Sequence, residues 1–166
     1  MRFRETVDLA HPIDRVKRAY GRREFFLERY RQLGFSDLEL LRDGGDGEAA
    51  YEIAFTATQK TDLPLPAFAS KLLGKTQHVK QEERWDLARG KGRIQTSPRG
   101  APVSVRAEVR MTEVAGGTRL EMDWEIEAKI PLLGGKIEKL AADEVRARMP
   151  KDAALSNDLV GRFGER

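Results

Sequence analysis

Few residues in this 166-residue chain have the types and spacing that acid–base, nucleophilic or metal chemistry requires. The absence of cysteine excludes thiolate metal sites, thiol catalysis and disulfide scaffolds. His11 and His78 are the two histidines, and neither has acidic partners at metal-ligand spacing. Glu82 and Glu83 are adjacent, so on a strand they point to opposite faces and cannot form a catalytic carboxylate pair. We therefore expect no catalytic residue, no metal site and no cofactor.

One predicted strand carries polar residues on the same face as apolar ones. Gln77, Gln81 and Glu83 share this face with Val79 and Trp85. Polar groups on an inward face must find hydrogen-bond partners or water. Two interpretations stay open: these residues, Glu83 above all, orient the polar end of a ligand, or the strand reaches past the core or contains a bulge that swaps its faces.

Basic residues gather near the N-terminus and could contact anionic lipid or nucleic acid. The acidic residues Asp14, Glu24 and Glu28 are interleaved with them, and pairs four residues apart account for several of the charges. A solvated surface is the stronger interpretation, and we expect no nucleic-acid partner. The basic residues are Arg15, Lys17, Arg18, Arg22, Arg23, Arg29 and Arg31.

Composition limits the class of protein. With 40% hydrophobic and 34% charged residues, and a net charge of +3 from 30 basic and 27 acidic residues, the chain is a globular domain. We expect one domain over residues 1–166, with residues 161–166 frayed. The charged N-terminus differs from a signal peptide, and the chain lacks a long apolar run. We therefore expect a cytoplasmic protein without stable membrane insertion, and composition leaves its oligomeric state open.

The elements that position these residues follow from periodicity. Alternation predicts a first strand over 3–9, and helical spacing predicts two short helices over 13–20 and 25–33. Further strands are predicted around residues 38–41, 51–57, 76–88, 93–97, 103–112 and 119–130. A short helix is expected at 67–73. A long helix should follow Gly134-Gly135, with a bend or break at Pro150 and a second segment from about 151 to 160.

This order predicts an α+β fold. Six or seven strands joined by short turns form an antiparallel sheet, and several strands have one apolar and one charged face. Only two short helices and one long helix are available to cover the apolar face. A curved sheet wrapped around the long C-terminal helix satisfies this requirement and leaves room for a cavity between sheet and helix.

Three stretches carry a resemblance to a known superfamily. They are residues 3–20, residues 63–74 followed by Glu83-Arg84-Trp85, and the segment from Gly100 to Leu140 with its Ile-Pro-Leu-Leu-Gly-Gly-Lys sequence at 130–136. The chain resembles the START-like (SRPBCC) superfamily of helix-grip proteins, which includes the birch pollen allergen and polyketide cyclases. Within it, the chain is most similar to an uncharacterised bacterial domain family. The resemblance implies a hydrophobic pocket for a lipid or similar small molecule and no defined chemistry.

The candidate pocket residues are the inward side chains of the strands and of the long helix, although an ordinary filled core would place them in the same way. Segment 63–74 is either a lid with Leu72 and Leu73 at the cavity mouth or a packed crossover. The candidates are Tyr51, Phe55, Leu73, Val79, Trp85, Met111, Met122, Trp124, Ile126, Ile137, Leu140, Ala141 and Val145, with Glu83 as the polar group.

Three functional hypotheses follow. The first is a non-catalytic carrier or sensor that binds a lipid or other hydrophobic small molecule in the cavity. The second is an enzyme of cyclase or dehydratase type that uses the same cavity, for which Glu83 is the best available base. The third is an interaction module that uses the basic N-terminal helices to contact a membrane surface or RNA.

Overall fold

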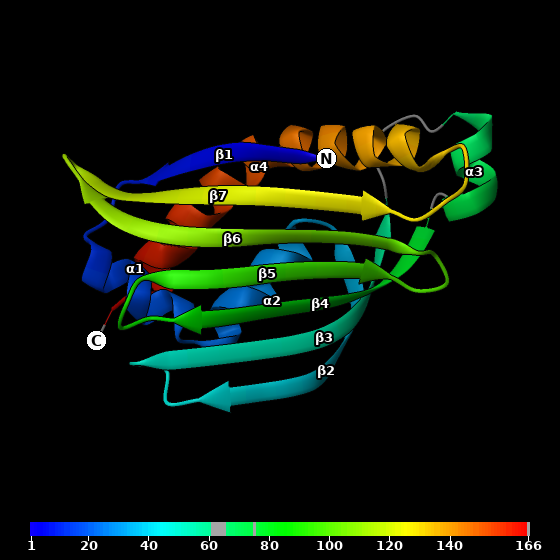
Figure 1. Ribbon diagram of the computed structural model, residues 1–166. Helices are drawn as coiled ribbons and strands as arrows, with labels where there is room; N and C mark the ends of the chain where they lie inside the picture. The colour runs from blue at the N-terminus through cyan, green and yellow to red at the C-terminus, as the bar shows by residue number, and fades with distance from the viewer. Residues whose placement is uncertain (61–65, 75, 166) are drawn as a thin grey trace.

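Seven strands form one antiparallel sheet in the computed structural model, which describes residues 1–60, 66–74 and 76–165 (Figure 1). The strand order across the sheet is β1-β7-β6-β5-β4-β3-β2. Successive strands from β2 to β7 are therefore adjacent, whereas β1 pairs with β7 and lies at the opposite edge from β2. The strands are β1 (Arg2–Leu9), β2 (Phe35–Gly45), β3 (Ala50–Lys60), β4 (Thr76–Asp86), β5 (Lys91–Pro98), β6 (Val103–Val114) and β7 (Gly117–Ala128).

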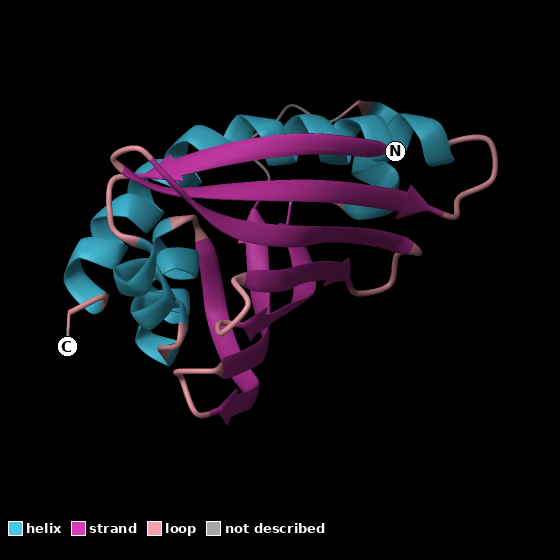
Figure 2. Cartoon of the chain, turned by 60° about the vertical axis from the view of Figure 1, so that its left-hand side comes forward, coloured by secondary structure: helices cyan, strands magenta, loops and turns pink. Residues whose placement is uncertain are grey.

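Four helices complete the described fold: α1 (Ile13–Tyr20), α2 (Arg23–Gln32), α3 (Ala67–Leu73) and α4 (Gly134–Phe163). The sheet curves around α4, and α1 and α2 lie on the same side of the sheet as α4 (Figure 2). The short helix α3 lies at the end of the sheet where β7 leads into α4 (Figure 1). The predicted α+β helix-grip architecture is thereby confirmed. Residues 63–65 of the predicted loop lie outside the described residues.

Helix α4 runs without interruption for 30 residues with Pro150 inside it, so of the bend or break predicted at this position the break does not occur. Proline removes one backbone donor and leaves the carbonyl four residues earlier without its helical partner. Pro150 is exposed, and water can satisfy that carbonyl. The red C-terminal part of α4 slopes away from the direction of its orange N-terminal part (Figure 1).

The C-terminal end of α4 is attached to α1 and to the residues that follow α1. Arg15 donates to the carbonyl of Gly161, Arg18 to that of Gly164 and Arg22 to that of Glu165, at 2.7, 2.8 and 3.0 Å. These cations complement the unpaired carbonyls and the negative dipole end of a helix. The contacts hold residues 161–165, which the sequence predicts to fray, against the start of the fold.

Aromatic side chains fill the core beneath α1 and α2. The ring of Tyr20 lies 4.6 Å from that of Phe25 and 4.7 Å from that of Trp85, and Phe26 stacks on Tyr51 at 5.7 Å. A separate, smaller cluster of Ala69, Val103 and Ile137 joins α3 to the sheet and to the start of α4. The two ends of the molecule are therefore packed differently: aromatic rings fill the core under α1 and α2, whereas small and aliphatic side chains form the buried cluster beside α3.

The outer face of the sheet carries opposite charges on neighbouring strands. The register places Arg93 opposite Glu108 and Arg4 opposite Asp123, and each pair forms an ion pair at 2.7 Å. Such exposed pairs add little stability individually, but like charges in these positions would repel. The strict alternation of charged and apolar residues in the sequence thus defines a solvated outer face and a covered inner face.

Candidate functional site

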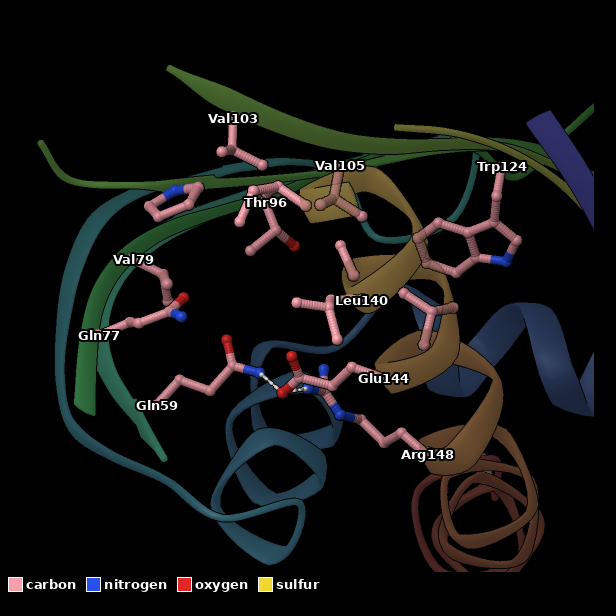
Figure 3. A pocket seen from close by; sticks show the side chains of 14 residues that line it. Gln59, Gln77, Val79, Thr96, Val103, Val105, Trp124, Leu140, Glu144 and Arg148 are labelled. Carbon is pink, nitrogen blue, oxygen red and sulfur yellow. Dashed lines mark hydrogen bonds and ion pairs between the residues drawn. The ribbon is translucent and has the colours of Figure 1, made fainter. Parts of the chain in front are cut away.

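A cavity of about 90 Å³ lies between the sheet and the first half of α4, at the end of the molecule where α3 packs (Figure 3). Five strands, β3 to β7, and helix α4 contribute to its walls, which consist mainly of aliphatic side chains and the ring of Trp124. The lining residues are Gln59, Gln77, Val79, Thr96, Pro98, Val103, Val105, Trp124, Ile137, Leu140, Ala141, Glu144, Val145 and Arg148.

The spacing of the lining residues explains why they meet. On α4 they recur every three or four residues from Ile137 to Arg148, which is the spacing of a single helix face. Most of the strand residues come from strand ends: Gln59 is next to last in β3, Gln77 is second in β4, and Val103 begins β6. The cavity therefore lies toward one end of the inner strands, beyond the aromatic core.

Helix α3 covers this end of the cavity. Ala69 is fully buried and packs with Val103 and Ile137, two residues that also line the cavity. Lys136 at the start of α4 places its ammonium 5.6 Å from the centre of the Phe68 ring, which adds a second contact between the two helices. The side chains of Leu72 and Leu73, the predicted gating residues, lie outside the described residues.

The two charged groups in the lining are paired with each other. Glu144 accepts a hydrogen bond from the Arg148 guanidinium at 3.1 Å and one from the Gln59 amide at 3.4 Å, and all three side chains converge on one wall of the cavity (Figure 3). The Arg148 guanidinium also lies 5.6 Å from the centre of the Phe35 ring. The cavity thus combines apolar walls with one polar wall whose formal charges cancel.

A smaller chamber of about 40 Å³ adjoins the main cavity and shares Thr96, Trp124, Val145 and Arg148 with it. Its far wall is polar and leads into a chain of buried hydrogen bonds. The Thr96 hydroxyl donates to the side-chain oxygen Oε1 of Gln81 at 2.5 Å, and the side-chain amide of Gln81 donates to the Tyr30 hydroxyl at 2.7 Å. Tyr30 in turn donates to Glu83 Oε2 at 2.9 Å.

Glu83 ends this chain in a fully buried position, where Arg29 and Asp152 complete the network. Arg29 lies 3.5 Å from Glu83 and forms two hydrogen bonds to Asp152, at 2.8 and 3.2 Å. Burial raises the pKa of Glu83 above its ordinary value, against the opposing effects of Arg29 and Tyr30. Burial alone would lower the pKa of Arg29, but Asp152 and Glu83 raise it well above its ordinary value. The network joins α2, β4 and α4.

The polar stripe on β4 faces inward as part of a regular strand. The pairing of β3 with β4 is continuous, from Ala50 opposite Asp86 to Lys60 opposite Thr76, so no bulge swaps the faces. Gln81 and Glu83 are buried, and Glu82 points to the outer face, where it pairs with Arg42 at 3.2 Å. Gln81 and the Oε2 atom of Glu83 have hydrogen-bond partners within the protein, as their burial requires.

Part of the candidate set meets at the cavity. Trp124, Val79, Ile137, Leu140, Ala141 and Val145 line it. Met122 lines the smaller chamber, whereas Glu83 lies behind Tyr30 and Gln81 and lines neither space. The remaining described candidates are buried in the core and line neither space: Tyr51, Phe55, Trp85, Met111 and Ile126.

Several lining residues were absent from the candidate set because their signals are weak. Glu144 and Arg148 are charged and read as surface residues, although they continue the helix face that begins at Ile137. Gln59, Thr96 and Pro98 lie near strand ends, where alternation no longer distinguishes an inner from an outer face. Extending the three-to-four-residue spacing along α4 would have found Glu144 and Arg148.

The basic N-terminal residues are mostly committed to contacts within the protein. Three of the arginines contact the C-terminal end of α4, as described above. In addition, Arg23 pairs with Asp43 at 3.1 Å, and Arg29 is buried with Asp152. His11 shares a 2.8 Å hydrogen bond with the carbonyl of Asn157, and His78 is exposed beside Thr58. Within residues 1–60, 66–74 and 76–165, no three His, Asp or Glu side chains are grouped as metal ligands.

No helix in the described part of the chain combines the length and the apolar character that crossing a bilayer requires.

Comparison with known proteins places the chain among uncharacterised relatives. Residues 4–160 match the model of a family described as "Protein of unknown function (DUF2505)". The uncharacterized protein Rv0481c of Mycobacterium tuberculosis is 24% identical over 151 residues, which cover 86% of this chain and 87% of that protein.

Solved structures share the fold at low sequence identity. The protein TTHA0849 from Thermus thermophilus has a TM-score of 0.63 and 18% identity, covering 96% of this chain and 97% of that chain. Norcoclaurine synthase from Thalictrum flavum, in complex with dopamine and hydroxybenzaldehyde, has a TM-score of 0.59 and 15% identity, covering 100% of this chain and 89% of that chain. The similarity establishes a common fold.

Proposed function

This chain belongs to the DUF2505 family, whose function is unknown, and we propose that it binds an uncharged, largely apolar small molecule in the cavity between the sheet and α4. It acts as a non-catalytic carrier or sensor in the cytoplasm. The observation that carries the proposal is the cavity itself: one face of α4 from Ile137 to Arg148 leaves open volume against the strand ends, where a packed core would be filled. The resemblance to START-like proteins implies a pocket of the same kind.

The size of the cavity limits the ligand. At about 90 Å³, with a neighbouring chamber of about 40 Å³, the space approaches the roughly 150 Å³ apolar cavity that admits benzene. Pockets for drug-sized ligands occupy roughly 300–1,000 Å³. A ring or a slender chain therefore fits the present volume, and a larger ligand requires the cavity to widen.

The charges of the lining favour an uncharged ligand. Glu144 and Arg148 already neutralise each other, and a ligand carboxylate near Arg148 would also approach the Glu144 carboxylate. Gln59, Gln77 and Thr96 offer amide and hydroxyl groups for hydrogen bonds to a ligand hydroxyl or carbonyl. An alcohol or ketone with an apolar body matches this lining better than a fatty acid does.

The position of Glu83 favours binding over catalysis. A cyclase or dehydratase needs a titratable group within hydrogen-bond reach of its substrate. Glu83, the base that the enzyme hypothesis names, is fully buried behind Tyr30 and Gln81 and lines neither chamber. Glu144 is the carboxylate that does line the cavity, and it is already paired with Arg148. The interaction-module alternative is weakened because the N-terminal arginines mostly contact α4 and nearby carboxylates.

The proposal is tested by binding of a neutral fluorescent probe, Nile red, and its displacement by 1-decanol or decanoate. The dye is larger than the present volume, so its binding also requires the cavity to widen. Ala141→Phe fills the cavity from α4 and should weaken probe binding about tenfold or more, since each 1.4 kcal/mol lost is tenfold. Ala154→Phe places the same side chain on an exposed position of α4 and serves as the matched control. Decanol should displace the probe more effectively than decanoate.

Unchanged probe affinity in a folded Ala141→Phe protein would exclude this cavity as the binding site. Native mass spectrometry of the freshly purified protein gives an independent readout, because a retained ligand would appear as an added mass that Ala141→Phe removes. Preferential displacement by decanoate would contradict the uncharged ligand class while leaving the cavity as the site.

A further inference from the structure

The loop between β7 and α4 presents a leucine to solvent in a strained backbone. Leu132 is fully exposed, at 102% of its reference area, and its φ of +64° lies in the left-handed region that disfavours a branched residue. Pro131 beside it is also exposed. A polar residue or glycine would meet less strain at this position, so the fold holds an apolar side chain out into water at a local cost.

Basic residues surround this leucine at the same end of the molecule. This α3-end surface consists of α3, the turn between β5 and β6 and residues 129–139, which lie together where the sheet ends (Figure 1). Its exposed basic residues form no ion pair with any acidic residue in the described part of the chain. They are Lys71, Arg99, Lys129, Lys136 and Lys139.

The acidic residue within this surface is already engaged. Glu138 lies 3.7 Å from the amino group of Met1 and accepts a hydrogen bond from the backbone amide of Ala128 at 3.4 Å. On the outer face of the sheet, by contrast, arginines are paired with carboxylates, as in Arg106 with Glu125 and Arg84 with Glu52. The α3-end surface is therefore locally positive and carries an exposed apolar tip.

We propose that the α3-end surface docks on the surface of an anionic lipid bilayer, with Leu132 and Pro131 at the level of the headgroups and the basic side chains among the lipid phosphates. An exposed apolar tip gains free energy by entering the interface, and nearby lysines are attracted to anionic lipids. Nucleic acid would satisfy the charges but offers no apolar environment for Leu132. The cavity lies directly beneath this surface, so docking brings it next to the membrane.

Vesicle co-sedimentation tests this docking, using phosphatidylcholine with about one third phosphatidylserine, and phosphatidylcholine alone as the neutral surface. The protein should bind the anionic vesicles at low salt and lose binding at ~0.5 M salt. Leu132→Ser should weaken binding about tenfold, since it removes one inserted apolar side chain. Lys136→Glu combined with Lys139→Glu should weaken it by about tenfold or more.

Two matched variants control for general effects. Leu41→Ser removes a leucine that is 54% exposed on β2, and Lys91→Glu reverses an exposed charge at the other end of the sheet; both should bind as the unmodified chain does. Absence of binding to anionic vesicles at low salt would overturn the proposal. Salt-sensitive binding that ignores Leu132→Ser would also overturn it, because that result indicates a purely electrostatic partner such as nucleic acid. The proposal stands beside the cavity proposal: Leu132→Ser should leave Nile red affinity unchanged, so the two can fail separately.

Discussion

Tyr30 donates its hydroxyl hydrogen to Glu83 at 2.9 Å and accepts a hydrogen bond from Gln81 at 2.7 Å, so a carboxylate without access to water is separated from the cavity by one phenol and one amide. This arrangement explains how a fold with open interior volume tolerates a buried acid. Glu83 belongs to the scaffold of the cavity, and its effects should appear in stability before they appear in ligand binding.

Stability should fall as the pH rises through the titration of Glu83. Burial raises its pKa above the ordinary 4.5, so between that value and the folded-state pKa the native protein holds a proton that the unfolded chain has released. The stabilising contribution is complete below the unfolded-state pKa and is lost above the folded-state pKa. Urea unfolding at a series of pH values should show a slope of at most about 1.4 kcal/mol per pH unit from this one group.

Glu83→Gln should remove this slope. Asp8, Asp46, Asp123 and Glu125 have lowered pKa values, so their contributions are lost only as the pH falls below their ordinary values of 3.8 to 4.5, outside the window of Glu83. A Glu83→Gln protein with the same pH slope as the unmodified chain would show that another group is responsible.

Arg29→Ala should be among the most destabilising single substitutions in the chain. It removes a buried cation that holds Asp152 with two hydrogen bonds and lies 3.5 Å from Glu83, and it leaves both acids without their partner. Breaking a buried ion pair in this way costs about 3–5 kcal/mol. Arg93→Ala removes an exposed partner of Glu108 and should change the free energy of unfolding very little. Equal effects in denaturant titrations would contradict the scaffold role of Arg29.

The two tryptophans should report differently on ligand binding. Trp124 lines the cavity, whereas Trp85 packs against Tyr20 in the aromatic core and lines neither chamber. A brominated alcohol quenches tryptophan by contact, so it should quench the fluorescence of the unmodified protein and of Trp85→Phe. In Trp124→Phe the quenching should disappear. Quenching retained in Trp124→Phe would place the bound molecule elsewhere.

Gly92→Ala should destabilise the fold through a steric clash. A Cβ at this position would overlap the indole ring of Trp85, which crosses over Gly92 on the neighbouring strand. Overpacking of this kind costs about 1–3 kcal/mol. Gly135→Ala provides the control: it meets no atom within 4 Å in the first turn of α4 and should stabilise the helix by about 0.4–1 kcal/mol. The two thermal midpoints should therefore shift in opposite directions.

Much of the fold could be predicted from the sequence because the alternation of charge and apolar character is regular. Leu120, Met122 and Trp124 on β7 alternate with charged residues, and this pattern alone indicates a strand with one covered face. The strand order follows from short turns between successive strands. The continuity of α4 through Pro150 could not be predicted in this way, since it depends on the exposure of that residue in the folded protein.

The cavity was harder to predict than the fold. Periodicity identifies which side chains face inward, but it does not distinguish a lining residue such as Val79 from a packed one such as Phe55. That difference depends on how the aromatic side chains of α1 and α2 fill one end of the sheet and not the other. The role of Arg29 was also hidden, because its partners Glu83 and Asp152 lie 54 and 123 residues away in the sequence.

The ion pair between Arg29 and Asp152 makes the grip of the sheet on α4 asymmetric. From Asp152 onward the helix is anchored by a buried ion pair and by three arginines. Its first four turns are held by aliphatic contacts, by α3 and by more exposed polar contacts such as that of Arg146 with Glu5. Separating the two charges of a buried ion pair costs much free energy, whereas aliphatic side chains can shift against one another without losing a polar contact. The α3 end of the helix should therefore move more easily than the end that begins at Asp152. A guest molecule should enter and leave on the α3 side.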